Sequence, residues 1–214
     1  MNKTNTASLL VRPFSVHPAS VMTQEWLAAL PEKTGKTAEE WVAIAQSSGL
    51  GEKKELSAWL KSEFSFGTNQ ALWITEFALG EEDSIAMSTN VGYLNAAERW
   101  IDEQYSGKKE HLRPAFEKIL NTAYNLSPEV KASPTKTYCS LFRKYAFGQI
   151  KPTTNTRIDI GLALADEPCV GKLLDTGGAK KGDRITHRIA ITSPNDIDDE
   201  VEHWLRLAFS KDTK

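Results

Sequence analysis

The chain has 214 residues, with 40% hydrophobic and 25% charged side chains and a formal net charge of −2. This is the composition of an ordinary globular protein, and it excludes a fibrous chain, a low-complexity chain and a strongly basic chain. The apolar run at residues 9–11 is broken by Arg12 and Pro13, so it is too short for a signal-peptide core or a membrane span. We therefore expect a cytoplasmic protein with no membrane partner, whose residues 1–17 form a flexible polar arm.

Residues 18–80 are predicted to form a helical domain of four short helices. Thr37 followed by Glu40 is a capping box and predicts the start of the second helix. In the fourth helix the predicted buried stripe includes Leu72 and Phe77. Each helix contains one tryptophan: Trp26, Trp41, Trp59 and Trp73. Because so small a domain needs large side chains to fill its core, we interpret these as core residues, the alternative being a stacking platform for a ligand.

Residues 81–92 are acidic and then polar, and we predict that they link the helical domain to a second domain at residues 93–214. The charge balance changes at this point. Residues 1–92 hold 7 basic and 11 acidic side chains, whereas residues 93–214 hold 19 and 17, as expected for two domains with different surfaces. The second domain should begin with two amphipathic helices, broken at Ser106 and at Ser127, and end with a helix that starts near Ser193.

Between these helices the hydrophobic pattern changes from a helical period to a strand period. Candidate strands are residues 137–142, 145–151 (ended by Pro152), 156–164 and 184–192. In the third, Ile158 and Ile160 point one way and Arg157 and Asp159 the other. Such alternation predicts an antiparallel sheet covered by helices on one face. The predicted fold class is therefore α+β, with a four-helix domain followed by a helix–helix–antiparallel sheet–helix domain.

Residues 131–157 are the most informative stretch for function, because they contain six basic side chains, no acidic one and several aromatics. Basic side chains attract phosphates, and aromatics among them can stack on bases. Strand alternation also places Arg157 and Arg188 on the face opposite the isoleucines. The predicted anion-binding residues are Lys136, Tyr138, Arg143, Lys144, Arg157 and Arg188.

Asp159 and His187 form a second candidate polar site. Asp159 is either a catalytic or metal-binding carboxylate or, in the favoured interpretation, the partner of Arg157 or Arg188 across strands. His187 shares strand parity with Ile185 and Ile189, which favours a hydrogen-bonded core histidine over a general base. The two cysteines lie outside any metal-ligand pattern, and the chain has no nucleotide or hydrolase fingerprint. We therefore predict no catalytic residue, no metal and no cofactor.

Several stretches resemble two bacterial domain families of unknown function. The first domain resembles a small helical family in LPEKTGKTAEEWVAIAQSSGL and KKELSAWLKSEFSFG. The second resembles a C-terminal α+β family in GKKEHLRPAFEKIL, SPTKTYCSLFRKYAFGQIKPTTNTRIDIGLAL and THRIAITSPNDIDDEVEHWL. That family also occurs in predicted transport proteins and near restriction-type systems. The resemblance implies two domains in this order, and it carries no activity, substrate or catalytic residue.

Three functions are compatible with these patterns. The leading hypothesis is a non-catalytic binding protein whose sheet domain contacts an anionic partner such as nucleic acid. The second is a protein–protein interaction or scaffold module in which the basic face docks the two domains. The third is a small-molecule enzyme with a pocket lined by Asp159 and His187. An exposed basic cluster favours the first, and its burial under the helical domain favours the second.

Overall fold

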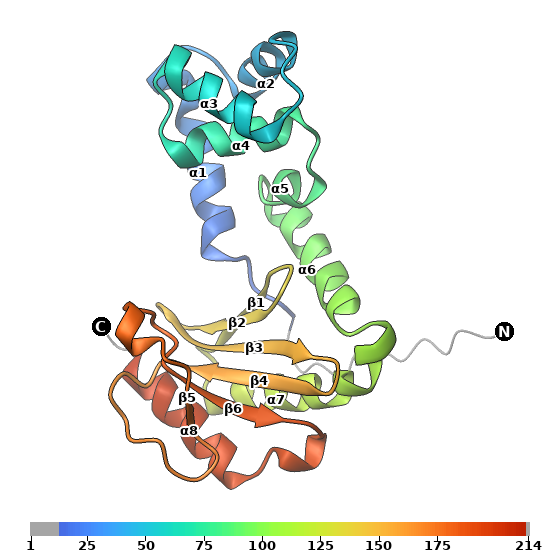
Figure 1. The fold of residues 1–214 in the computed structure, drawn as a ribbon, viewed down its shortest axis with the longest axis vertical. Helices are drawn as coiled ribbons and strands as arrows, with labels where there is room; N and C mark the ends of the chain where they lie inside the picture. The colour runs from blue at the N-terminus through green and yellow to red at the C-terminus, as the bar shows by residue number, and fades with distance from the viewer. Residues whose placement is uncertain (1–12, 213–214) are drawn as a thin grey trace, which may run out of the picture. The chain divides into compact units, whose positions relative to one another are not determined.

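The computed structural model describes residues 13–212, which divide into two compact units (Figure 1). The helical unit is Val16–Ala96, and the sheet unit comprises Ala97 onward together with the segment that ends at Ser15. A helical region is followed by an antiparallel sheet and a terminal helix, so the predicted α+β class is confirmed. Residues 81–92, predicted to be a linker, contain the short helix α5 (Glu82–Ala86) and the start of α6 (Asn90–Gln104).

The helical unit is built from the helices that local sequence signals predict. Thr37 and Glu40 form the expected capping box, with Thr37 N–H donating to Glu40 Oε2 at 2.7 Å and Glu40 N–H to Thr37 Oγ1 at 3.3 Å. Gly35 ends the first helix in the left-handed conformation, at φ 73°, which favours glycine. Besides α5, the helices are α1 (Pro18–Thr34), α2 (Ala38–Ser47), α3 (Lys53–Phe64) and α4 (Thr68–Ala78).

Of the four tryptophans, Trp41 is the one that lies fully in the core of the helical unit. It is 5% exposed and meets Phe66 edge-to-face at 4.8 Å between ring centroids. Trp26 and Trp59 are half-buried at the margin of the core, and Trp73 packs on Trp26 with a centroid distance of 5.1 Å. The prediction of four core tryptophans is therefore confirmed for Trp41. It is wrong for the other three, which are only half-buried and pack at the margin of the core.

Helix α4 buries a different face from the one predicted. Its buried residues are Ala71, Ile74 and Thr75, while Leu72 and Phe77 are half-buried. The helix is apolar on nearly every side, so periodicity alone does not select a face. It packs against both α2 and α3, and a small residue such as Ala71 allows that close approach.

The sheet unit is a six-stranded antiparallel sheet in the order β1-β2-β3-β4-β6-β5. Helices α7 (Arg113–Leu126) and α8 (Asp199–Lys211) lie against one side of it (Figure 1). Their apolar faces are buried there, and Phe116, Ile160 and Leu205 belong to a single core. We call the other side the open face. The strands are β1 (Lys131–Pro134), β2 (Cys139–Phe142), β3 (Ala146–Thr154), β4 (Arg157–Leu162), β5 (Leu174–Asp175) and β6 (His187–Ile191).

The strand predictions need three corrections. Strands β1 and β5 were not predicted, because β1 is a short segment that ends in Pro134 and β5 has only two residues. Pro152 does not end β3, because the register with β4 shifts between Lys151 and Thr154, and such an irregularity accommodates a residue without an N–H. Ile185 does not share the covered face with Ile189. The alternation breaks where Thr186 and His187 are both buried, and Ile185 lies on the open face against Gly161.

Part of the predicted flexible arm is ordered. Ser15 N–H donates to Ala132 O at 2.8 Å, and Ser133 Oγ donates to Ser15 O at 2.7 Å. These bonds lay the segment that ends at Ser15 along the outer edge of β1, where an unpaired strand edge would otherwise remain. Residues 1–12 of the predicted arm lie outside the described residues.

Candidate functional site

Asp159 on the open face lies between two arginines. Its Oδ1 is 2.9 Å from Arg157 Nε and 3.2 Å from Arg188 Nη1. The Asp159 side chain is 13% exposed, whereas the two arginines are about one-third exposed. The predicted pairing is therefore confirmed for both arginines, and the carboxylate is held by two guanidinium groups. Within residues 13–212, no group of three or more His, Cys, Asp and Glu side chains is placed to hold a metal ion.

Lys151 extends this positive surface toward the end of β3. In the β3–β4 register Lys151 is the direct partner of Asp159, and directly paired residues of antiparallel strands project on the same face. The open face therefore carries Lys151, Arg157 and Arg188 around one carboxylate. Each guanidinium has five N–H donors, so donors remain on both arginines beyond those that contact Asp159.

A groove of about 540 Å³ lies beside Lys151, and we call it the basic groove. It is walled by the end of α6, the 3-10 turn η1 (Gly107–Leu112), the turn before β2 and the end of β3. Four lysines line it against one acid, Glu103. The lysines are Lys108, Lys109, Lys136 and Lys151.

Two hydrogen bonds hold the walls of the basic groove together. Lys109 Nζ donates to Pro152 O at 2.7 Å, and Gln104 Nε2 donates to Thr135 O at 2.8 Å. Gln104 is 9% exposed, and its other amide atom, Oε1, accepts no hydrogen bond from any described residue. The Oε1 atom is covered by the surrounding protein, so Gln104 contributes to the groove by holding its wall in place through Thr135.

Arg143 and Lys144 lie in the β2–β3 turn, at the opposite end of β2 from Lys136. The Arg143 guanidinium lies 4.5 Å from the centroid of the Phe209 ring, and its Nε donates to Asp212 O at 3.2 Å. Arg143 is therefore a structural residue that ties this turn to the end of α8. Lys144 is exposed beside the ring of Tyr145. The structure thus divides the six predicted anion-binding residues into three places: Lys136 with Tyr138, Arg143 with Lys144, and Arg157 with Arg188.

His187 is buried on the covered face, as its strand parity predicts. Its Nδ1 shares a hydrogen bond of 2.8 Å with Thr186 Oγ1, and its Nε2 lies 2.9 Å from Glu167 O. With both ring nitrogens engaged, the interpretation as a hydrogen-bonded core histidine is confirmed. The predicted polar site of Asp159 and His187 is wrong as a single site, because the two side chains lie on opposite faces of the sheet.

The basic groove contains residues that sequence reasoning did not select, namely Gln104, Lys108 and Lys109. The pair Lys108–Lys109 directly follows a helix break, which is a common place for a solvated charge pair. No local signal shows that this turn packs against the end of β3, some forty residues further along. Lys151 was counted in the basic segment, but its strand register with Asp159 was needed to place it.

The fold and this surface define a protein with a helical unit and an antiparallel α+β unit that carries a basic groove. Residues 101–211, more than half of the chain, match the domain of unknown function DUF5655, and the chain belongs to this family. Residues 22–78 match a second domain of unknown function, DUF4287, so the predicted succession of two such domains is confirmed. No curated protein and no solved structure matches the chain. No helix in residues 13–212 is long and apolar enough to span a bilayer.

Proposed function

We propose that the sheet unit is a non-catalytic binding module for nucleic acid, which it contacts through the phosphate backbone. The observation that carries the proposal is the basic groove, with four lysines against one glutamate. Lys108 and Lys151 are exposed and form no ion pair with any residue in 13–212. Cations that are not neutralised within the protein are those that can release counterions from a phosphate backbone, which is the main source of affinity in sequence-independent binding.

The groove and the open face support an extended ligand rather than a single ion. Lys151 lines the groove and is also the register partner of Asp159, so it connects the groove to Arg157 and Arg188. Phosphate contacts position a ligand without reading its sequence, so the expected binding is weak and has little sequence preference.

The test is a titration of labelled single- and double-stranded oligonucleotides at several salt concentrations. With three to five phosphates contacted, binding to a single strand should fall with salt at a log–log slope of about −2 to −4. The triple variant Lys108→Gln, Lys136→Gln, Lys151→Gln should flatten that slope by about 2, since each lost contact removes about 0.7. Its matched control removes three exposed lysines of the same unit outside the groove: Lys131, Lys180 and Lys181.

Two outcomes would count against the proposal. The absence of binding at about 50 mM salt, where the electrostatic contribution is strong, would exclude a nucleic-acid function. Equal weakening by both triple variants would show that the net charge of the protein matters and the groove does not. The scaffold alternative predicts that neither variant changes oligonucleotide binding and that a protein partner is lost instead.

The proposed compartment remains the cytoplasm, where nucleic acid is accessible and where free thiols such as Cys139 and Cys169 persist.

A further inference from the structure

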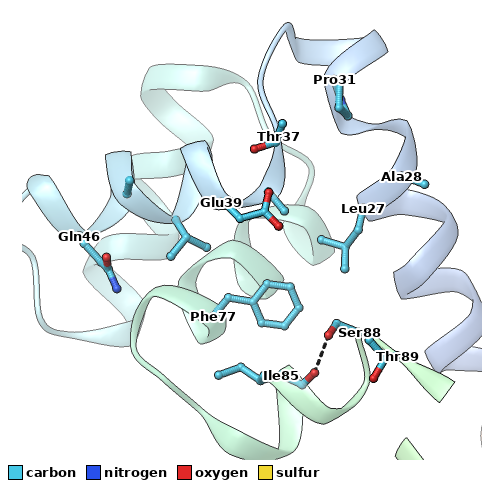
Figure 2. A pocket seen from close by; sticks show the side chains of 13 residues that line it. Leu27, Ala28, Pro31, Thr37, Glu39, Gln46, Phe77, Ile85, Ser88 and Thr89 are labelled. Atoms are coloured by element: carbon cyan, nitrogen blue, oxygen red, sulfur yellow. Dashed lines mark hydrogen bonds between the residues drawn. The ribbon is translucent and has the colours of Figure 1, made fainter. Parts of the chain in front are cut away.

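The helical unit contains an apolar hollow of about 670 Å³, which we call the helical pocket (Figure 2). Helices α1, α2 and α4 form its walls, and the segment from α5 to Thr89 closes one side. All of its lining residues belong to the helical unit, so it is independent of the basic groove. Its volume falls within the range of about 300–1,000 Å³ that is typical of small-molecule sites.

The walls of the helical pocket are made of large apolar side chains that the core leaves accessible. Leu27 from α1 and Phe77 from α4 face the hollow (Figure 2), and Val42 from α2 also lines it. Ile85 of α5, another lining residue, is 44% exposed. The recess exists because small residues, including Ala38 and Ala43, occupy the positions between them. Apolar side chains grouped in a concavity can bury their surface only against something that enters it.

The neutral polar groups at the rim are already used by the protein. Ser88 Oγ donates to Ile85 O at 2.7 Å (Figure 2), and Gln46 Nε2 donates to Ala78 O at 3.1 Å. Thr89 Oγ1 accepts a hydrogen bond from Gly92 N–H at 3.0 Å. The Thr37 hydroxyl accepts one from Glu40 N–H, as part of the capping box of α2. These groups have structural roles, so they do not define what a ligand must offer.

Glu39 differs from the rest of the rim, because it is the one ionisable side chain among the 13 lining residues. Figure 2 shows its carboxylate projecting from α2 into the hollow, on the side of Phe77. No Lys, Arg or His of residues 13–212 lies within ion-pair distance of it. Hydrogen bonds from its own backbone N–H and from Thr37 lower the pKa of Glu39, so the group is ionised at neutral pH.

We propose that the helical pocket binds a small organic cation with an apolar aliphatic or aromatic body and a protonated amine. The body would occupy the space between Leu27, Val42 and Phe77, and the ammonium group would pair with the Glu39 carboxylate. Phe77 lines the same hollow as Glu39, and the face of an aromatic ring also attracts cations. A carboxylate head group would meet Glu39 as a like charge, and the pocket lining holds no cation to compensate for it.

The test uses the full-length protein and three probes with the same body and different head groups: 3-phenylpropylammonium, 3-phenylpropanol and 3-phenylpropionate. Calorimetry or chemical-shift titration should show the ammonium probe binding near the millimolar range expected for so small a ligand. The alcohol should bind about 3- to 5-fold more weakly, because an exposed ion pair contributes little. The carboxylate probe should bind more weakly than the alcohol.

Three variants separate the contribution of the charge from that of the cavity. Glu39→Gln should abolish the preference for the ammonium probe over the alcohol and leave the affinity for the alcohol unchanged. Glu63→Gln, on the exposed side of α3 and outside the pocket, removes the same charge and should change neither affinity. Ala43→Trp, at an exposed position of the pocket wall, should block all three probes, with circular dichroism and thermal unfolding confirming that the fold is intact.

Equal affinity of the native protein for the three probes would overturn the proposed cation specificity. Persistence of the ammonium preference in Glu39→Gln would overturn the assignment of the charge to Glu39. Absence of binding by any probe at about 10 mM, well above the expected dissociation constant, would overturn the site itself. None of these results depends on oligonucleotide binding, so this proposal and the nucleic-acid proposal fail separately.

Discussion

The ammonium group of Lys109 donates a hydrogen bond of 2.7 Å to the main-chain oxygen of Pro152. This contact joins η1 to the end of β3 at the register shift that accommodates the proline. Lys109 and Pro152 both line the basic groove, so the same contact connects two of its walls. Lys109 therefore has two roles in our proposal, as a positive charge and as the link between the turn that carries Lys108 and the strand that carries Lys151.

The double role of Lys109 can be tested by comparison with its neighbour. Lys109→Met and Lys108→Met remove the same charge, but only the first removes the hydrogen bond to Pro152. We expect Lys109→Met to lower the free energy of unfolding by about 1 kcal/mol and to weaken oligonucleotide binding more than Lys108→Met. Urea unfolding and fluorescence anisotropy measure the two effects. Identical behaviour of the two variants would mean that the contact with Pro152 does not order the groove.

Replacing Asp159 should lower stability and strengthen polyanion binding at the same time. Asp159→Asn leaves Arg157 and Arg188 without their shared carboxylate and makes the open face more positive. The expected loss is about 1–2 kcal/mol, less than for a fully buried pair because both arginines are partly exposed. Asp166→Asn changes the net charge equally at an exposed loop position with no ion pair within residues 13–212. If Asp166→Asn increased oligonucleotide affinity as much as Asp159→Asn, the gain would come from net charge and not from the open face.

The four tryptophans of the helical unit should differ in their contribution to stability. Trp41→Ala should cost about 3–5 kcal/mol, because it opens a cavity in the core. Trp59→Ala should cost clearly less, since Trp59 is half-buried and its removal exposes less apolar surface. Denaturant unfolding of the two variants gives the comparison directly. Equal losses would show that Trp59 is as important to the core as Trp41.

The sequence predicted those features that depend on neighbours along the chain. The capping box of Thr37 and Glu40 needs a spacing of three residues, and the opposite faces of Ile160 and Asp159 need only strand alternation. The basic groove could not be predicted, because it depends on packing between η1 and β3, which no local pattern encodes. The face of α4 was mispredicted for a similar reason, since packing against α2 and α3 decided between two apolar faces.

Acid should destabilise the start of the last helical segment through Asp196. Its Oδ2 accepts hydrogen bonds from Thr192 N–H at 2.7 Å, Thr192 Oγ1 at 2.8 Å and Ser193 N–H at 3.0 Å. These bonds lower the pKa of Asp196 below its ordinary value of 3.8. A carboxyl group whose pKa is lower in the folded state stabilises the protein above its unfolded pKa, and that contribution is lost as the pH falls through the folded pKa.

Asp196→Asn should therefore reduce stability at neutral pH and lose less stability than the native protein as the pH falls below about 4. Thermal unfolding between neutral pH and acid, with Asp183→Asn at an exposed loop position as the control, checks this. Parallel stability curves for the native protein and Asp196→Asn would show that Asp196 does not contribute to the acid sensitivity.

The predicted anion-binding turn of Arg143 and Lys144 does bind an anion, but the anion belongs to the same chain. Asp212, 1% exposed in the side chain, accepts hydrogen bonds from the backbone N–H groups of Arg143, Lys144 and Tyr145 at 3.1–3.2 Å. Arg184 Nη2 adds a contact of 3.0 Å to Asp212 Oδ1. Successive backbone N–H groups that converge in this way form a nest for a carboxylate.

Removal of the Asp212 carboxylate should leave these three N–H groups and the Arg184 guanidinium without their partner. We expect Asp212→Ala to cost about 2–4 kcal/mol, since hydrogen bonds to a charged group are stronger than neutral ones and buried donors left unpaired are costly. Asp199→Ala, at an exposed position in the first turn of the same helix, should cost only a few tenths of a kcal/mol. Hydrogen exchange at Arg143, Lys144 and Tyr145 should accelerate in Asp212→Ala alone. If those amides stay protected, the turn is held by other contacts, and Arg143 and Lys144 again become candidates for an external anion.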